Sequence, residues 1–188
     1  MRITAHYAPL WKETQMAILV TYASKHGATE GIAERVTQRL RIVGRTVDLQ
    51  PISGDPNPES YDAVVIGSAV YFGSWLKEAT AYIHRHRDML AARPIWLFSD
   101  GPLGSEATET NGGEVQPREL AEFQRTIYPQ GHQIFFGALD GAKLTLPERI
   151  VVKAVRAPEG DFRDWAEVDA WATSIAHQLP LARTAPIP

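Results

Sequence analysis

The sequence contains no cysteine among its 188 residues. This excludes disulfides, cysteine-ligated iron–sulfur clusters and thiol catalysis, and it disfavours a structural zinc site. A long hydrophobic run is also missing, because no window reaches the roughly 18 consecutive apolar residues of a membrane-spanning helix. The chain has no large excess of one charge either: its formal net charge is −3, which predicts no bulk attraction to nucleic acid.

The remaining composition is that of an ordinary globular protein. Apolar residues make up 44% of the chain and charged residues 22%. The length makes one domain the simplest expectation and suffices for a full hydrophobic core. The absence of thiols is compatible with a cytoplasmic location, which is the location that we expect.

The most informative stretch is Ala17–Glu30, which reads AILVTYASKHGATE. It opens on a short apolar run, typical of a strand that is buried on both faces. A loop of small, polar and cationic residues follows. Ile32, Val36 and Leu40 then recur at helical spacing on one face. A strand, a short loop and a helix N-terminus together favour phosphate binding, because the unpaired amides of the first turn and the helix dipole attract an anion.

The candidate phosphate-binding residues are the six that link this strand to the helix: Ser24, Lys25, His26, Gly27, Ala28 and Thr29. Gly27 would let the backbone approach the anion closely, while Ser24 and Thr29 would supply hydroxyl donors. The stretch matches neither G-x-x-x-x-G-K-[ST] nor G-x-G-x-x-G. Taken alone, it also fits an ordinary connection in an α/β protein.

Two further loops follow predicted buried strands. After a strand at residues 62–67 come Ser68, Ala69, Val70, Tyr71, Phe72 and Gly73. After a strand at residues 94–98 come Ser99, Asp100, Gly101, Pro102 and Gly104. Tyr71, Phe72 or Trp75 could stack on a flat ring, or fill the core or a subunit contact instead. The glycines and proline of the later loop expose backbone groups that can read the polar edge of a ring.

The rest of the chain completes an alternating α/β pattern. We expect a short edge strand around residues 47–49, a fifth strand at 133–137 and a last helix capped by Asp164 with Glu167 at its third position. Residues 138–163 form an insert or lid. It contains a basic amphipathic helix candidate at 147–157, for which a membrane surface is the weaker alternative to packing on the domain.

The two ends of the chain carry no strong pattern. We interpret residues 1–15 as an N-terminal extension, of the kind that an alternative start codon adds, and expect folding and cofactor binding without them. The alternative is an arm that covers the sheet edge through Tyr7 and Trp11. Residues 180–188 are expected to be a flexible tail, which leaves 16–179 as the domain.

The motif Y-x-S-x-x-G-x-T, carried by Tyr22, Ser24, Gly27 and Thr29, resembles the phosphate loop of the flavodoxin family. The sequence G-A-L before the basic helix candidate and D-x-x-D-W at the opening of the last helix resemble the menaquinone-dependent protoporphyrinogen dehydrogenase type within that family. The resemblance implies a flavodoxin-like three-layer α/β sandwich, with a five-stranded parallel sheet of order 2-1-3-4-5. In flavodoxins FMN lies where this strand order reverses, and the three loops would meet there.

The same resemblance implies an FMN-binding oxidoreductase whose redox substrate is a quinone or a tetrapyrrole. The alternatives are a non-catalytic electron-transfer protein and a relative that binds a deazaflavin. Electron-shuttling flavodoxins are typically far more acidic than this chain, which weighs against a simple shuttle. No catalytic acid or base, metal site or nucleic-acid partner is expected; peripheral membrane contact and oligomerisation stay open.

Overall fold

The computed structural model describes residues 16–101, 116–139 and 160–180. Its central sheet has five parallel strands in the order β2-β1-β3-β5-β6. These strands are β1 (Ala17–Ala23), β2 (Thr46–Pro51), β3 (Ala63–Tyr71), β5 (Ile95–Gly101) and β6 (Gly131–Phe136). Numbered along the chain as parallel strands, this is the predicted order 2-1-3-4-5, so the predicted sheet is confirmed.

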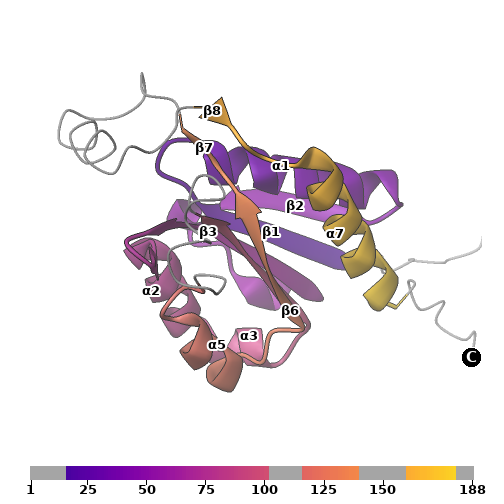
Figure 1. Cartoon of the computed structure of the whole chain (residues 1–188). Coiled ribbons are helices and arrows are strands. Elements are labelled where there is room, and N and C mark those ends of the chain that lie inside the picture. Colours follow the sequence, from indigo (N-terminus) through magenta and orange to yellow (C-terminus); the bar gives the residue numbers. More distant parts are fainter. Residues whose placement is uncertain (1–15, 102–115, 140–159, 181–188) are drawn as a thin grey trace, which may run out of the picture.

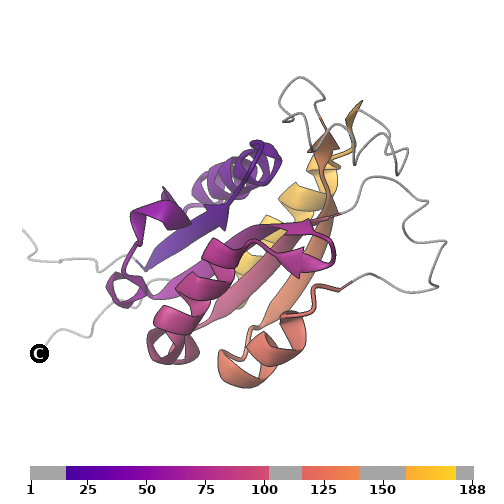
Figure 2. The ribbon, with the colours of Figure 1, turned by 90° about the vertical axis from the view of Figure 1, so that its left-hand side faces the viewer.

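Helices cover both faces of the sheet, as Figures 1 and 2 show. One face carries α1 (Ala28–Ile42) and α7 (Trp165–Gln178). The other carries α2 (Lys77–Arg85), α3 (Arg87–Ala91) and α5 (Leu120–Thr126). Two short 3-10 turns, η1 (Ile52–Gly54) and η2 (Pro58–Ser60), follow β2 in place of a full helix. The three-layer sandwich is therefore confirmed.

Strand β1 shows why its apolar run is continuous rather than alternating. Ile18 and Val20 belong to the core under α1 and α7, whereas Leu19 belongs to the core under α2, α3 and α5. All three side chains are fully buried. A strand buried on both faces needs apolar residues at successive positions, and this strand has them.

The ends of the last helix and of α1 follow the predicted local signals. The side chain of Asp164 accepts hydrogen bonds from the amides of Ala166 and Glu167, which confirms it as the N-cap of α7. Gly44 adopts a φ of 84° just after α1, the left-handed conformation that terminates a helix. Arg35 of α1 donates two hydrogen bonds to Asp169 of α7, at 2.7 and 2.6 Å, and so fastens the two helices to each other.

Two predicted loops are partly strand. Strand β3 continues through Tyr71, turns at Phe72 and Gly73, and pairs antiparallel with β4 (Ser74–Trp75). Strand β5 likewise continues through Gly101. The prediction that residues 68–71 and 99–101 lie in loops is therefore wrong. These small and polar residues are in strands because the two strands pair with each other here: Ser68 pairs with Ser99 and Ala69 with Asp100.

The predicted insert begins and ends in a small antiparallel pair. Strand β7 (Ala138–Leu139) follows β6 and pairs with β8 (Gly160–Asp161), so the two ends of the insert lie together. In Figure 2 the parallel strands run toward the side on which this pair lies. The predicted helix at 147–157, the extension 1–15, the tail residues 181–188, Pro102 and Gly104 lie outside the described residues. Within the described ranges, no helix is long and apolar enough to cross a membrane.

The packing at Gly67 gives a test of this core. Gly67 lies in β3, and a Cβ added there would meet the ring of Phe98 at 2.0 to 2.5 Å. Because the fully buried ring of Phe98 has no room to move, we expect Gly67→Ala to lower the free energy of unfolding by ~1–3 kcal/mol through overpacking. Urea denaturation measures the change.

The matched control is Gly54→Ala, because a Cβ at Gly54 meets nothing within 4 Å. Equal stability of the Gly67→Ala and Gly54→Ala proteins would contradict the close packing of β3 against Phe98.

Candidate functional site

The three predicted loops start from one edge of the sheet. Ala23 at the end of β1 is level with Ser68 of β3, and Ser68 is level with Ser99 of β5. The strand order reverses between β1 and β3, because β2 lies on one side and the remaining strands on the other. Ligands of open α/β sheets bind at such a reversal, beyond the carboxyl ends of the strands. The structure thus brings the described candidate residues to one place.

The turn into α1 leaves backbone amides for a ligand. Gly27 is the N-cap, with a φ of 89°, and it has no side chain to cap the helix. The first helical hydrogen bond runs from the amide of Gly31 to the carbonyl of Gly27, at 3.0 Å. The amides of residues 28–30 therefore precede the ladder of the helix and can donate to an anion. A branched residue at position 27 would strain this left-handed backbone.

Ser24 closes the turn from the other side. Its Oγ accepts a hydrogen bond from the amide of Gly27 at 3.0 Å. That bond uses a lone pair of Ser24 and not its hydrogen, so the hydroxyl can still donate to a ligand. Tyr22 has a supporting role, because its hydroxyl donates to Glu30 in the first turn of α1, at 2.7 Å.

The phosphate-loop candidates and the β3–β4 hairpin are in direct contact. The Lys25 ammonium lies 5.2 Å from the centre of the Tyr71 ring, a cation–π distance. Tyr71 is half-buried, whereas Phe72 at the tip of the hairpin is 82% exposed and has a φ of 52°. An exposed aromatic side chain on a left-handed residue is an uncommon feature, and here it lies at the edge where the loops meet.

The third aromatic candidate, Trp75, belongs to the core. Its side chain is buried, with its ring centre 5.3 Å from that of Phe123, and its indole nitrogen donates to Ser99 Oγ at 2.8 Å. The idea that Trp75 stacks on a bound ring is therefore wrong. Stacking by Tyr71 or Phe72 stays a prediction.

Two serine candidates use their hydroxyls inside the protein. Ser68 Oγ accepts from the amide of Leu76 at 3.1 Å and donates to the carbonyl of Ala69 at 2.9 Å. Ser99 Oγ accepts from Trp75 and lies 2.7 Å from Nε2 of His132. Burial lowers the pKa of His132 to about 4, so its neutral ring can accept the Ser99 hydrogen. Neither serine therefore has a hydroxyl hydrogen left for a ligand.

Asp100 is the buried acidic group of the site. Its carboxylate accepts a hydrogen bond from Thr29 Oγ1, at 2.9 Å, and its side chain is 7% exposed. Burial raises the pKa of Asp100 to about 6, against the opposing effects of the Thr29 hydroxyl and the Arg163 charge. Gly137 makes room for the carboxyl group, because a Cβ at Gly137 would overlap Oδ1. The Thr29 hydroxyl thus points to Asp100 in this structure.

Arg163 at the end of the insert was not among the predicted residues. It donates to both carboxylate oxygens of Asp161, at 2.8 and 2.6 Å, and its guanidinium lies 4.5 Å from the centre of the Trp165 ring. A Cβ added at Gly31 would lie 2.5 Å from Arg163 Nη1, so the glycine lets the arginine cover the first turn of α1. The sequence signal that could have indicated Arg163 is the acidic residue two positions before it, Asp161.

The remaining described candidate residues lie at or next to the carboxyl edge of the sheet. Lys25 is exposed, and half-buried residues at this edge are His26, Gly27, Ala28, Val70, Gly73 and Gly101. Ala69 is buried. Their contact with a cofactor stays a prediction. Among the described residues no group of three or more histidine or acidic side chains is arranged to hold a metal ion.

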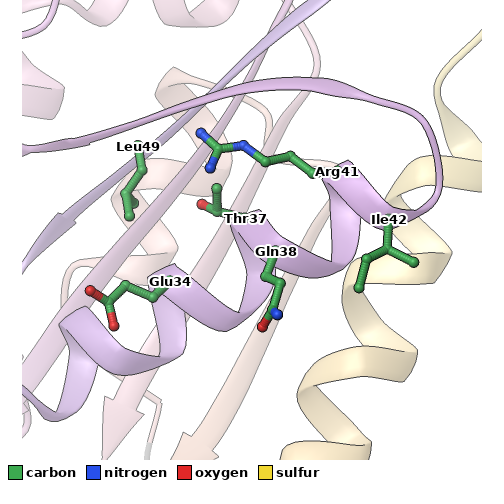
Figure 3. Close-up of a pocket in the computed structure, with 6 residues that line it drawn as sticks. All are labelled: Glu34, Thr37, Gln38, Arg41, Ile42 and Leu49. Carbon is green, nitrogen blue, oxygen red and sulfur yellow. The ribbon is translucent and has the colours of Figure 1, made fainter.

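A shallow groove of about 550 Å³ lies elsewhere on the molecule (Figure 3). It is lined by Glu34, Thr37, Gln38, Arg41 and Ile42 of α1 and by Leu49 of the edge strand β2. These residues belong to the later turns of α1, whereas the candidate site surrounds its first turn. The groove is therefore separate from the carboxyl edge.

The fold and this edge define a flavodoxin-like α/β protein with a turn at the start of α1 that no side chain caps. A family model described as a flavodoxin domain matches residues 19–165, and the chain belongs to this family. The resemblance noted from the sequence is thereby confirmed. Family and fold indicate a flavin-binding oxidoreductase of the flavodoxin type.

Known proteins of similar sequence share one name. Protoporphyrinogen IX dehydrogenase (quinone) of Escherichia coli (strain K12) is 21% identical over 173 residues, which cover 86% of this chain and 96% of that protein. The protein of the same name from Leishmania major is 24% identical over 184 residues, which cover 87% of this chain and 76% of that protein.

Solved structures support the fold. Oxidised flavodoxin 2 from Bacillus cereus has a TM-score of 0.57 and 20% identity, covering 87% of this chain and 99% of the other. Rubredoxin oxygen:oxidoreductase from Desulfovibrio gigas has a TM-score of 0.58 and 14% identity; the match covers 88% of this chain and 37% of that one.

The buried carboxyl of Asp100 predicts a pH-dependent stability. Its pKa is about 6 in the folded protein against an ordinary value of 3.8, so its proton stabilises the fold below pH 4 and the benefit is lost as pH rises through 6. A shift of about two units is worth up to ~3 kcal/mol. We expect the unfolding free energy of Asp100→Asn, relative to the unaltered protein, to rise by up to that amount between pH 4 and pH 8.

Chemical denaturation at several pH values measures this difference. Asp88→Asn is the matched control, because the Asp88 side chain is 90% exposed. A pH-independent difference for Asp100→Asn would contradict a buried carboxyl that titrates near pH 6.

Proposed function

We propose that the chain binds FMN at the carboxyl edge of its sheet and acts as an FMN-dependent oxidoreductase linked to a quinone. The observation that carries the proposal is the contact between Lys25 of the α1 turn and Tyr71 of the β3–β4 hairpin. It places an uncapped helix N-terminus, suited to a phosphate, beside aromatic side chains suited to a flat ring.

The phosphate end of the site is built from backbone and hydroxyl donors. The amides of residues 28–30 and the hydroxyl of Ser24 would hold the phosphate, with Gly27 permitting the close approach. Lys25 adds a positive charge at the exposed side of the turn. Riboflavin lacks the phosphate, so these donors would distinguish FMN from it.

The ring end of the site is built from the strand ends. Tyr71 and Phe72 offer aromatic surface, and the backbone of residues 69–70 and 100–101 offers polar groups for a ring edge. When bound, FMN would supply the redox chemistry, taking electrons from a reduced substrate and passing them to an acceptor. The chain would bind and orient the flavin, and no side chain is assigned as a catalytic acid or base.

A quinone acceptor is favoured by the relatives and by Phe72. The relatives named above are called protoporphyrinogen IX dehydrogenase (quinone), and the alignments span most of each chain. The exposed Phe72 ring beside Tyr71 gives a flat apolar group such as a quinone a surface to contact. The relatives' name also favours a tetrapyrrole as the electron donor.

The FMN site predicts a preference for FMN over riboflavin. Replacing Ser24, whose hydroxyl hydrogen is left for a ligand, with Ala should weaken FMN by ~1.5–3 kcal/mol, roughly ten- to hundredfold, and leave riboflavin nearly unchanged. Gly27→Val should weaken FMN more, because its φ of 89° does not accept a branched side chain. Lys25→Ala should cost less and its effect should fall with salt, since the side chain is exposed.

Titration of flavin fluorescence measures these affinities. Equal affinity of the unaltered protein for FMN and riboflavin would overturn the phosphate site. The mass and absorption spectrum of the molecule that copurifies would separate FMN from a deazaflavin.

The proposed reaction predicts turnover with a quinone. The FMN-loaded protein with a reduced substrate, protoporphyrinogen first, should reduce a short-chain quinone faster than free FMN does. Phe72→Ala should raise KM for the quinone by a larger factor than it weakens FMN, because Phe72 is 82% exposed and lies outside the phosphate turn. Rates equal to those of free FMN with every donor would favour the non-catalytic electron-transfer alternative.

A further inference from the structure

A buried carboxyl group lies directly behind the proposed phosphate turn. Asp100 accepts the hydroxyl hydrogen of Thr29, at 2.9 Å between Oγ1 and Oδ2, and the two side chains are 0% and 7% exposed for Thr29 and Asp100. Thr29 belongs to the first turn of α1, whose amides would hold the phosphate. A carboxylate at this distance from the turn repels an anion.

The hydroxyl of Thr29 has only one hydrogen to give. While Asp100 is ionised, that hydrogen is committed to Oδ2, and Thr29 presents only lone pairs to a phosphate. Ser24 differs, because its Oγ accepts from the amide of Gly27 and keeps its hydrogen. In this arrangement Ser24 is a phosphate donor and Thr29 is not.

A proton on Asp100 reverses this arrangement. Protonated Oδ2 can donate to Thr29 Oγ1, and Thr29 can then turn its own hydrogen toward a phosphate oxygen. The proton is released by an acid in the solvent and forms an O–H bond at Oδ2 of Asp100; all other changes are in hydrogen bonds. The repulsive carboxylate thereby becomes the start of a chain of donors that ends on the ligand.

The surroundings of Asp100 allow this protonation near neutral pH. Burial raises the pKa of Asp100 to about 6. Among the described residues, the charged groups that act on it are Arg163, which lowers the value, and Asp161, which raises it. Arg163 donates to both oxygens of Asp161. Thr29 from α1 and Gly137 from the β6–β7 junction lie against the carboxyl group itself.

We propose that Asp100 is a positioning residue that takes up a proton when a flavin phosphate binds, so that Thr29 becomes a phosphate donor. The inference rests on the proposed FMN site. It makes the affinity for FMN, but not for riboflavin, depend on the protonation of a side chain that does not itself touch the ligand.

The sign of the pH dependence follows from the bound phosphate. Its negative charge raises the pKa of Asp100 above the ligand-free value of about 6. The gain in FMN affinity is therefore complete below pH 6 and is lost as pH rises toward the value of the complex. In that window one proton changes the dissociation constant by up to about tenfold per pH unit.

Calorimetric titration in two buffers of different ionisation enthalpy measures the protons taken up on binding. At pH 7, the unaltered protein should take up more protons per FMN than Asp100→Asn does, the difference approaching one. Riboflavin should give no difference. The FMN phosphate itself titrates with both proteins, so the comparison isolates the contribution of Asp100.

Affinity measured against pH gives a second readout. The amide of Asp100→Asn can donate to Thr29 at any pH, so this variant should bind FMN up to about hundredfold more tightly than the unaltered protein at pH 8 and about equally at pH 5.5. A merely structural role of Asp100 would weaken both ligands at both pH values.

Two substitutions of Thr29 test the relay without altering Asp100. Thr29→Val keeps the shape but removes the hydroxyl, and should lose the FMN-specific proton uptake. Thr29→Ser keeps a hydroxyl and should retain it. This pair decides the matter even where Asp100→Asn does not fold.

Equal proton uptake by the unaltered protein and Asp100→Asn would overturn the inference, and so would equal uptake by Thr29→Val and Thr29→Ser. If the unaltered protein still prefers FMN over riboflavin in that case, the proposed FMN site stands. Loss of that preference in the unaltered protein would instead overturn the FMN site itself.

Discussion

The parallel pairing of β1 with β3 is the constraint on which the rest of the structure depends. It places Ala23 of β1 beside Ser68 of β3, and Ser68 in turn pairs with Ser99 of β5. Because both faces of these strands are covered by helices, the register is fixed: a shift by one residue would exchange the side chains of the two cores. The turn into α1 and the β3–β4 hairpin consequently start side by side, and Lys25 can reach Tyr71.

Polar groups at this edge divide into two kinds. Ser68, Ser99 and His132 are paired with protein partners and hold the strand ends in place. The Ser24 hydroxyl hydrogen and the amides that precede the first helical bond of α1 remain for a ligand. The hydrogen bonds of these three side chains hold the strand ends in place, and the strand ends in turn fix the positions of the ligand donors. Without its partner, a buried polar side chain would be destabilising.

The sequence predicted the strands and the helix faces, because these depend on local signals: apolar runs, helical spacing and glycine or aspartate at helix ends. The sheet order was implied by the resemblance to the flavodoxin family, and the place of the cofactor stays a prediction. The sequence did not predict that Ser68 and Ser99 turn inward, since this depends on Leu76, Trp75 and His132 as partners, from other parts of the chain. The sequence left the role of Trp75 open between stacking and core for the same reason, and the structure places it in the core. The sequence alone does not distinguish an aromatic residue that faces a ligand from one that packs in the core, as Trp75 does against Phe123.

Asp100 shows how a destabilising group can be retained at a functional edge. The buried carboxyl would be less costly as an amide, yet Gly137 leaves room for it and Thr29 supplies a hydrogen bond. Arg163 lies near enough to act on its charge but is held by Asp161. Asp161 and Arg163 lie at the end of the insert, and Thr29 lies in the first turn of α1. The pKa of Asp100 therefore depends on both segments. A group placed in this way can link what happens at the insert to the strength of the phosphate site, which a permanently neutral side chain could not do.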